Sequence, residues 1–146
     1  MSEEFRTVVK ALITNNGKVL IGRKEDGDHP IAGEWHILGG HLEIGEHPEE
    51  AVEREVEEET GLEVEVHQIV DVSTFSWTDG EKDSLQILYH TEAESREAEA
   101  SSDLSDVKWV SPEKLVEELG EKDAFRMKER DNQQKFLEKM KKAPIF

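Results

Sequence analysis

A short glutamate-rich segment with well-marked ends stands out in the first half of the sequence. It reads PEEAVEREVEEET from Pro48 to Thr60 and is followed by Gly61. Proline is favoured in the first turn of a helix and glycine just past its end, because each fits the backbone geometry there. Val52 and Val56 stand one helical turn apart, so they form an apolar stripe that can pack on a sheet. The sequence therefore predicts a helix over 48–60 with one buried edge.

The same helix carries a cluster of like charges. Glu55, Glu58 and Glu59 are three and four positions apart, so they share one face. Their repulsion costs roughly a few tenths of a kcal/mol per pair, and the helix dipole disfavours anions toward the C-terminus. A bound divalent cation would offset this cost, and oxygen ligands of this kind suit Mg²⁺ or Mn²⁺. For a glutamate-rich helix taken alone, a solvated charged face is the favoured interpretation, so the cluster by itself does not establish a metal site.

Apolar runs separated by turn residues predict strands on both sides of this helix. Residues 5–14 are followed by Asn16-Gly17 and a second run over 19–21. This pattern predicts a β-hairpin, because Asn and Gly tolerate the positive φ of tight turns. Further strands are expected over 35–38, 62–77, 84–91 and 107–110, with a turn at 79–80 and a charged loop over 92–106.

Two helices are expected after the last strand. Ser111 is the expected N-cap of a helix that ends near Gly120, and residues 123–142 form a C-terminal helix. Strands and helices thus mix without strict βαβ alternation. The pattern predicts a single α/β domain over residues 1–146, with a mixed sheet covered by helices.

Composition excludes several classes of function. The chain has 146 residues, with 35 acidic against 18 basic side chains and a formal net charge of −17. Such a charge argues against a grip on duplex nucleic acid, whose phosphates require clustered Lys and Arg. No stretch approaches the roughly 20 apolar residues of a membrane span, and no apolar segment follows the first residues as in a secretory signal. With no cysteine, thiolate metal sites and Cys nucleophiles are excluded, and a cytoplasmic location is expected.

The spacing around the carboxylates carries more information than the carboxylates themselves. Gly40 is followed after five residues by Glu46, and after seven more by the run REVEEETGL that starts at Arg54. Residues 40–62 match the Nudix box, G-x5-E-x7-R-E-U-x-E-E-x-G-U with U apolar, at every specified position. The sequence therefore resembles the MutT-like Nudix hydrolases. The resemblance covers about residues 5–120, including the WHILGG run before the helix and the late VKWVSPEKL.

The resemblance implies an α/β/α sandwich and a metal-dependent hydrolase. Enzymes of this family use a divalent cation, here expected to be Mg²⁺ or Mn²⁺, to cleave a nucleoside diphosphate linked to another group. Their box glutamates bind the metal, which here implies Glu55, Glu58 and Glu59. A backbone carbonyl of the glycine pair often adds a ligand, and Gly39 is the candidate. Some members use an acid from a later loop, for which Asp103 is the candidate, with a solvated loop acid as the alternative.

Other box residues have supporting roles in the family. Arg54 orients the carboxylates by ion pairing, and Glu46 is its expected partner. Gly40 sets the loop geometry and counts among the substrate-binding positions, and Gly61 ends the helix. A carboxylate near the attacking water accepts its proton, and Glu55 matches the residue often assigned that role.

Substrate recognition involves residues outside the helix. Arg23 resembles the family's phosphate-contacting arginine, with a surface ion pair as the alternative. Trp35 either stacks on a base or packs in the core, and core packing is expected for Trp109. Thr78 replaces the proline associated with ADP-ribose cleavage, and Gly80 the tyrosine associated with diadenosine polyphosphates. We therefore expect a ribo- or deoxyribonucleoside triphosphate, cleaved to the monophosphate and pyrophosphate.

Several alternatives remain open at this stage. ADP-ribose or a nucleotide sugar is the alternative substrate. A non-catalytic Nudix-fold module that binds nucleotides is an alternative of another class, although such a module has no need of three clustered carboxylates. An acidic protein-binding module explains the charge but not the spacing. A homodimer is also expected, since dimers are common in the family, but the sequence defines no interface.

Overall fold

The computed structural model describes residues 4–25, 32–77, 82–101 and 103–119. In chain order the strands are β1 (Glu4–Asn15), β2 (Lys18–Lys24), β3 (Trp35–His36), β4 (Gly39–His41), β5 (Val64–Trp77), β6 (Lys82–Ala93) and β7 (Leu104–Val110). The helices are α1 (Pro48–Thr60), the 3-10 turn η2 (Pro112–Lys114) and the short α2 (Leu115–Glu118). The expected turn at 79–80 and the expected C-terminal helix over 123–142 lie outside the described residues.

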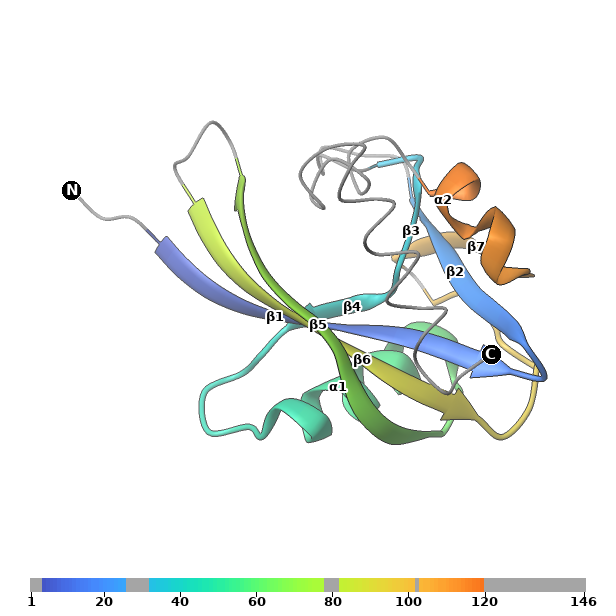
Figure 1. The fold of residues 1–146 in the computed structure, drawn as a ribbon, viewed down its shortest axis with the longest axis horizontal. Coiled ribbons are helices and arrows are strands. Elements are labelled where there is room, and N and C mark those ends of the chain that lie inside the picture. Colours follow the sequence, from blue (N-terminus) through green and yellow to red (C-terminus); the bar gives the residue numbers. More distant parts are fainter. Residues whose placement is uncertain (1–3, 26–31, 78–81, 102, 120–146) are drawn as a thin grey trace.

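The described strands form one mixed sheet (Figure 1). Its order is β3-β2-β1-β6-β5, with β4 also paired to β1 and β7 to β2. β1 and β6 run parallel along almost their whole length, whereas the other pairs are antiparallel. β1 pairs with β4 along residues 8–10 and with β2 along residues 13–15. This change of partner brings the glycine pair of β4 against the middle of β1.

Alternation along β1 directs its side chains into two separate cores. Val9 and Ile13 pack on one face of the sheet with Val56 of α1. Leu12 belongs to the other core, together with Leu115 of α2. Because successive residues of a strand point to opposite faces, α1 and α2 cover opposite sides of the sheet. The mixed sheet therefore lies between helices, as expected for the sandwich (Figure 1).

The first hairpin and α1 begin and end where the sequence predicts. Asn16 and Gly17 have φ values of 48° and 76°, the left-handed pair that a two-residue hairpin turn requires. Gly61 follows α1 with φ 76°, and its backbone N–H donates to the carbonyl of Glu57 at 2.8 Å. A residue in this left-handed conformation does not continue the helix. Glycine adopts it without the strain that most side chains would cause.

Several of the expected strand boundaries are wrong. The expected strand over 35–38 stops at His36, and the glycine pair itself enters β4, because β1 replaces β2 as the pairing partner. The charged loop expected over 92–106 is shorter, because β6 extends to Ala93 and β7 begins at Leu104. Ala93 still pairs with β5, and Leu104 already pairs with β2.

The helix after β7 also differs in its start. Ser111 occupies the N-cap position, but its side chain makes no capping hydrogen bond. Its carbonyl instead accepts from the N–H of Lys114 at 3.0 Å, which closes a 3-10 turn before α2. In the part of the chain that the structure describes, no helix is long and apolar enough to cross a membrane.

Val56 of α1 is fully buried, so its truncation tests the packing of this helix. Val56→Ala should lower the free energy of unfolding by about 1–3 kcal/mol, because it removes two methyl groups and leaves a cavity. Chemical denaturation without metal measures this loss. Glu53→Ala, an exposed site on the same helix, is the control and should change stability by less than about 0.5 kcal/mol. Equal effects of the two variants would contradict the packing.

Candidate active site

The glycine pair of β4 lies directly against the carboxylates of α1. A Cβ atom built on Gly40 would overlap the carboxylate of Glu55, and one built on Gly39 would overlap the carbonyl oxygen of Val9. The backbone N–H of Gly39 also hydrogen-bonds to Glu59. A side chain at position 39 would therefore push β4 away from the backbone of β1, and one at position 40 would displace the Glu55 carboxylate.

Glu59 is the most deeply placed of the three carboxylates. Burial raises its pKa to about 8, against the opposing charges of Lys10 and Lys24 and with a further rise from Glu55. Its Oε1 atom is buried and has no hydrogen-bond partner among the described residues. A buried oxygen without a partner is costly, and a divalent cation held between the carboxylates would satisfy it. The donor set therefore fits a hard metal ion.

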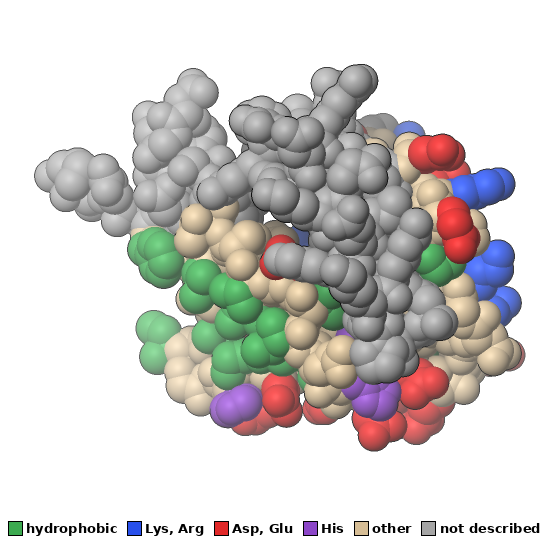
Figure 2. Space-filling model, viewed as in Figure 1, with side chains coloured by type: hydrophobic (Ala, Val, Ile, Leu, Met, Phe, Trp, Pro, Cys, Tyr) green, Lys and Arg blue, Asp and Glu red, His purple; other side chains and the backbone are tan. Residues whose placement is uncertain are grey.

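The other two carboxylates are progressively more exposed. The side chain of Glu55 is 15% exposed and that of Glu58 is 59% exposed. Burial raises the pKa of Glu55, while the neighbouring Arg54 lowers it. On the face shown in Figure 2, acidic side chains gather along the edge at which α1 lies in Figure 1. The cluster is thus closed at Glu59 and open to solvent at Glu58.

Arg54 connects the carboxylates to the preceding loop. Its Nε and Nη2 atoms donate to the two carboxylate oxygens of Glu46 at 2.7 and 3.0 Å, so the predicted ion pair is present and bidentate. Its Nη1 atom donates to Glu55 at 3.0 Å and to Glu58 at 3.2 Å. Its Nη2 atom also donates to the carbonyl of His41 at 3.2 Å. One guanidinium therefore orients three box carboxylates, those of Glu46, Glu55 and Glu58, and ties α1 to β4.

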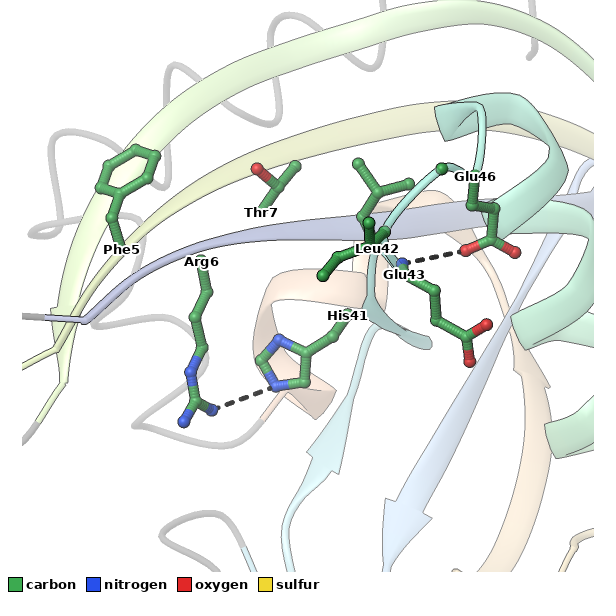
Figure 3. A pocket seen from close by; sticks show the side chains of 9 residues that line it. Phe5, Arg6, Thr7, His41, Leu42, Glu43 and Glu46 are labelled. Atoms are coloured by element: carbon green, nitrogen blue, oxygen red, sulfur yellow. Dashed lines mark hydrogen bonds between the residues drawn. The ribbon is translucent and has the colours of Figure 1, made fainter.

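The loop before α1 forms a compact turn beside an open hollow (Figure 3). The N–H of Glu43 donates to Oε1 of Glu46 at 3.1 Å, and the N–H of Glu46 returns a bond to the carbonyl of Glu43 at 3.0 Å. A hollow of about 480 Å³ separates this loop from Phe5 and Arg6 of β1. Arg54 lowers the pKa of Glu46, so the pair stays ionised near neutral pH.

Two predicted site residues outside the helix have no contact with the box carboxylates among the described interactions. Arg23 is exposed, and its Nε atom donates to the carbonyl of Gly33 at 3.1 Å. Asp103 is also exposed, and its carbonyl oxygen accepts from the N–H of Glu25 at 3.1 Å. The structure therefore brings Glu55, Glu58 and Glu59 together with the glycine pair. The loop before Asp103 contacts the same helix, since the N–H of Ser101 donates to the backbone carbonyl of Glu59 at 3.0 Å.

Trp35 and Trp109 are partly buried. Trp35 packs against the core that contains α2, and Nζ of Lys108 lies 4.2 Å from the centre of its ring. Lys108 in turn pairs with Glu118 at 2.6 Å. Trp109 packs against the other core, as expected. One face of Trp35 is thus covered by a cation.

Sequence reasoning missed one residue near the site. Lys10 lies in the middle of β1, is only 7% exposed, and its Nζ atom donates to the carbonyl of Ile37 at 2.8 Å. Its charge also acts on Glu59. The signal was present as a single lysine inside the apolar run VVKALI, where side chains are otherwise buried.

A second group of ligand-type side chains lies away from the box. The ligand atoms of Glu65, His67 and Glu92, on β5 and β6, lie within 4.8 Å of one another. All three side chains are exposed, and Nε2 of His67 is 3.2 Å from Oε1 of Glu92. Exposed acidic groups commonly gather without an ion, so the box remains the candidate centre.

Comparison with known proteins agrees with this geometry. A family model described as the NUDIX domain matches residues 4–131. The nucleoside triphosphatase NudI of Escherichia coli strain K12 is 34% identical over 120 residues, which cover 76% of this chain and 85% of that protein.

Solved structures show the same fold. The MutT protein from Methanosarcina mazei Go1 matches with a TM-score of 0.80 and 29% identity, over 97% of this chain and 99% of that one. The ORF135 protein of E. coli matches with a TM-score of 0.61 and 26% identity, over 79% of each chain.

The family match spans most of the chain and includes the whole box. In the structure Gly40, Glu46 and Arg54, all positions of the box, lie against one another or against the Glu55 carboxylate. This chain is a member of the Nudix hydrolase family.

Proposed function

We propose that this hydrolase cleaves a ribo- or deoxyribonucleoside triphosphate into the nucleoside monophosphate and pyrophosphate, with Mg²⁺ or Mn²⁺ as cofactor. The observation that carries the proposal is the buried Oε1 of Glu59, which has no hydrogen-bond partner among the described residues and lies beside Glu55 and the glycine pair. The similarity to NudI, named as a nucleoside triphosphatase, supports this substrate class. ADP-ribose and nucleotide sugars remain the alternative substrates.

Glu55, Glu58 and Glu59 are the proposed metal ligands. Their oxygens are the donors that Mg²⁺ prefers, and they converge from one helix face. The Gly39 carbonyl and Asp103 are proposed as additional ligands. When bound, the ion neutralises phosphate oxygens and activates a water for attack at phosphorus.

Glu55 is the proposed general base. Arg54 binds its Oε1 atom at 3.0 Å and thereby fixes the orientation of the carboxylate. Oε2 is then available to accept a proton from the attacking water. Partial burial raises the pKa of Glu55, which makes the carboxylate a stronger base than one in open solvent.

Arg23, Trp35 and Gly40 are the proposed substrate contacts. Arg23 and Trp35 are direct neighbours across β2 and β3, so a cation and an aromatic ring lie side by side at this sheet edge. Such a pair suits a phosphate and a base of one nucleotide. Lys108 covers one face of Trp35 and the ring packs against the core that contains α2, so a base would contact the part of the ring that remains exposed.

Further proposals concern the whole protein. We propose that residues 1–146 form one domain, that the protein is cytoplasmic, and that it forms a homodimer. Exposed apolar side chains, among them Ile69 and Val72, occur on β5, and hydrophobic side chains gather on the face shown in Figure 2.

Glu58→Gln tests the catalytic proposal. Hydrolysis should fall by about a hundredfold or more, because the variant loses a charged metal ligand but keeps its shape. Product analysis with Mg²⁺ should cover the nucleoside triphosphates, oxidised dGTP, ADP-ribose, GDP-mannose and a dinucleoside tetraphosphate. Glu57→Gln, exposed and adjacent, is the matched control and should keep full activity. Failure of a folded, Mg²⁺-binding protein to cleave any triphosphate would refute the proposed substrate class.

Arg54 and Glu46 should act as one unit. Arg54→Met is expected to lower activity by about tenfold to a hundredfold, because Glu55 and Glu58 lose their common donor. Glu46→Gln should have a smaller effect in the same direction. A double-mutant cycle on kcat/KM measures the coupling, and the double variant should be little worse than Arg54→Met. Fully additive losses would show that the ion pair does not orient the carboxylates.

The stability of the metal-free protein should depend on the ionisation of Glu59. Its pKa is about 8 in the folded state, against an ordinary value of 4.5, so the folded state holds a proton that the unfolded chain releases. Stability should therefore fall as pH rises from about 4.5 to 8. Glu59→Gln removes this loss, so at pH 9 with a chelator its Tm should exceed that of the wild type by several degrees. Glu57→Gln should follow the wild type, and parallel Tm curves for all three proteins would contradict the assignment.

A further inference from the structure

Lys10 occupies an unusual position for a lysine. It lies in β1 directly opposite Gly39 of β4, and only 7% of its surface is exposed. Lysine is rarely buried this deeply unless its ammonium has partners, because removing the charge from water is costly. No position of the Nudix box includes it, and no role above has been given to it. Its burial therefore needs an explanation.

The side chain of Lys10 crosses the glycine pair and anchors the turn that precedes it. A Cβ atom built on Gly39 would lie 2.9 Å from Cδ of Lys10, so the aliphatic stem passes directly over this residue. The ammonium donates to the carbonyl of Ile37 at 2.8 Å. The neighbouring N–H of Ala11 donates to the carbonyl of Leu38, also at 2.8 Å. Two adjacent residues of β1 thus hold two adjacent carbonyls between β3 and β4.

The segment held in this way is the one that Glu59 contacts. The N–H of Gly39 hydrogen-bonds to Glu59, and the charge of Lys10 acts on the same carboxylate. Lys10 is therefore linked to Glu59 twice, once through the backbone of Gly39 and once through its charge. Both links meet at the side of the cluster that is closed to solvent.

We propose that Lys10 is a positioning residue for the metal site. Lys10 holds the segment 37–40 in place and thereby fixes the position of this segment relative to the Glu59 carboxylate. The inference rests on the metal site of the proposed function but not on its substrate. A lysine that only filled the core would affect stability and leave metal affinity unchanged. A lysine that acted only as a nearby positive charge would weaken cation binding, so its removal would strengthen it.

Lys10→Met separates these roles, because it keeps an unbranched side chain and removes the ammonium. The affinity for Mn²⁺ alone is measured by calorimetry without nucleotide, and the exchange of the Gly39 and Gly40 amides by hydrogen–deuterium exchange. We expect Mn²⁺ binding about tenfold weaker, as is common when a group that orients a metal ligand is lost. Exchange of the two amides should become faster. Lys18→Met, in the first hairpin and away from the box, should match the wild type in both measurements.

Two further variants keep the test decisive. Lys10→Arg retains a cationic donor and should restore most of the Mn²⁺ affinity. Lys10→Gln is too short to reach the Ile37 carbonyl and should behave like Lys10→Met, which also covers the case in which the methionine variant does not fold. Unchanged or tighter Mn²⁺ binding in a folded Lys10→Met or Lys10→Gln protein would overturn the proposal. Because no nucleotide is present, a wrong substrate class would leave these results unaffected.

Discussion

The close approach of α1 to the glycine pair of β4 is the contact on which the site depends. The carboxylate of Glu55 occupies the space that a side chain at Gly40 would fill, and Gly39 presents its N–H to Glu59. Val56 holds the helix on the sheet from the same side, and β1 holds β4 from its edge. The hydrophobic core and the catalytic cluster therefore share one helix, so the packing that stabilises the fold also sets the positions of the carboxylates.

Concentrating carboxylates on one helix face carries an electrostatic cost that the fold offsets with few cations. Arg54 neutralises and orients the outer part of the cluster through its bonds to Glu46, Glu55 and Glu58. Lys10 acts on the inner part, where Glu59 is buried. The negative charge that these cations leave uncompensated would attract a divalent ion. Among the described residues the buried Oε1 of Glu59 has no hydrogen-bond partner, so this oxygen is available to bind the ion. The function of the site therefore depends on these few buried or paired groups and not on the net acidity of the surface.

Much of the fold and of the site could be predicted from local sequence, because the deciding interactions are local. Pro48 and Gly61 delimit α1, and Asn16-Gly17 turns the first hairpin through positive φ values. Boundaries that depend on distant partners were less accurate. β4 forms because its residues pair with β1, and β7 begins before the expected residue 107 because Leu104 pairs with β2. Ser111 does not cap with its side chain, although its identity favours that role.

By itself, the sequence determined the box, the face shared by Glu55, Glu58 and Glu59, and the pairing of Arg54 with Glu46. The shared face follows from helical periodicity, whereas the pairing of Arg54 with Glu46 was implied by the resemblance to the Nudix family. Only the tertiary structure decided how deeply each carboxylate is buried, which face of Trp35 is covered, and that Lys10 crosses the glycine pair. These features arise where strands far apart in sequence meet, and burial is a property of all the neighbours together. A residue pattern along one segment does not contain that information.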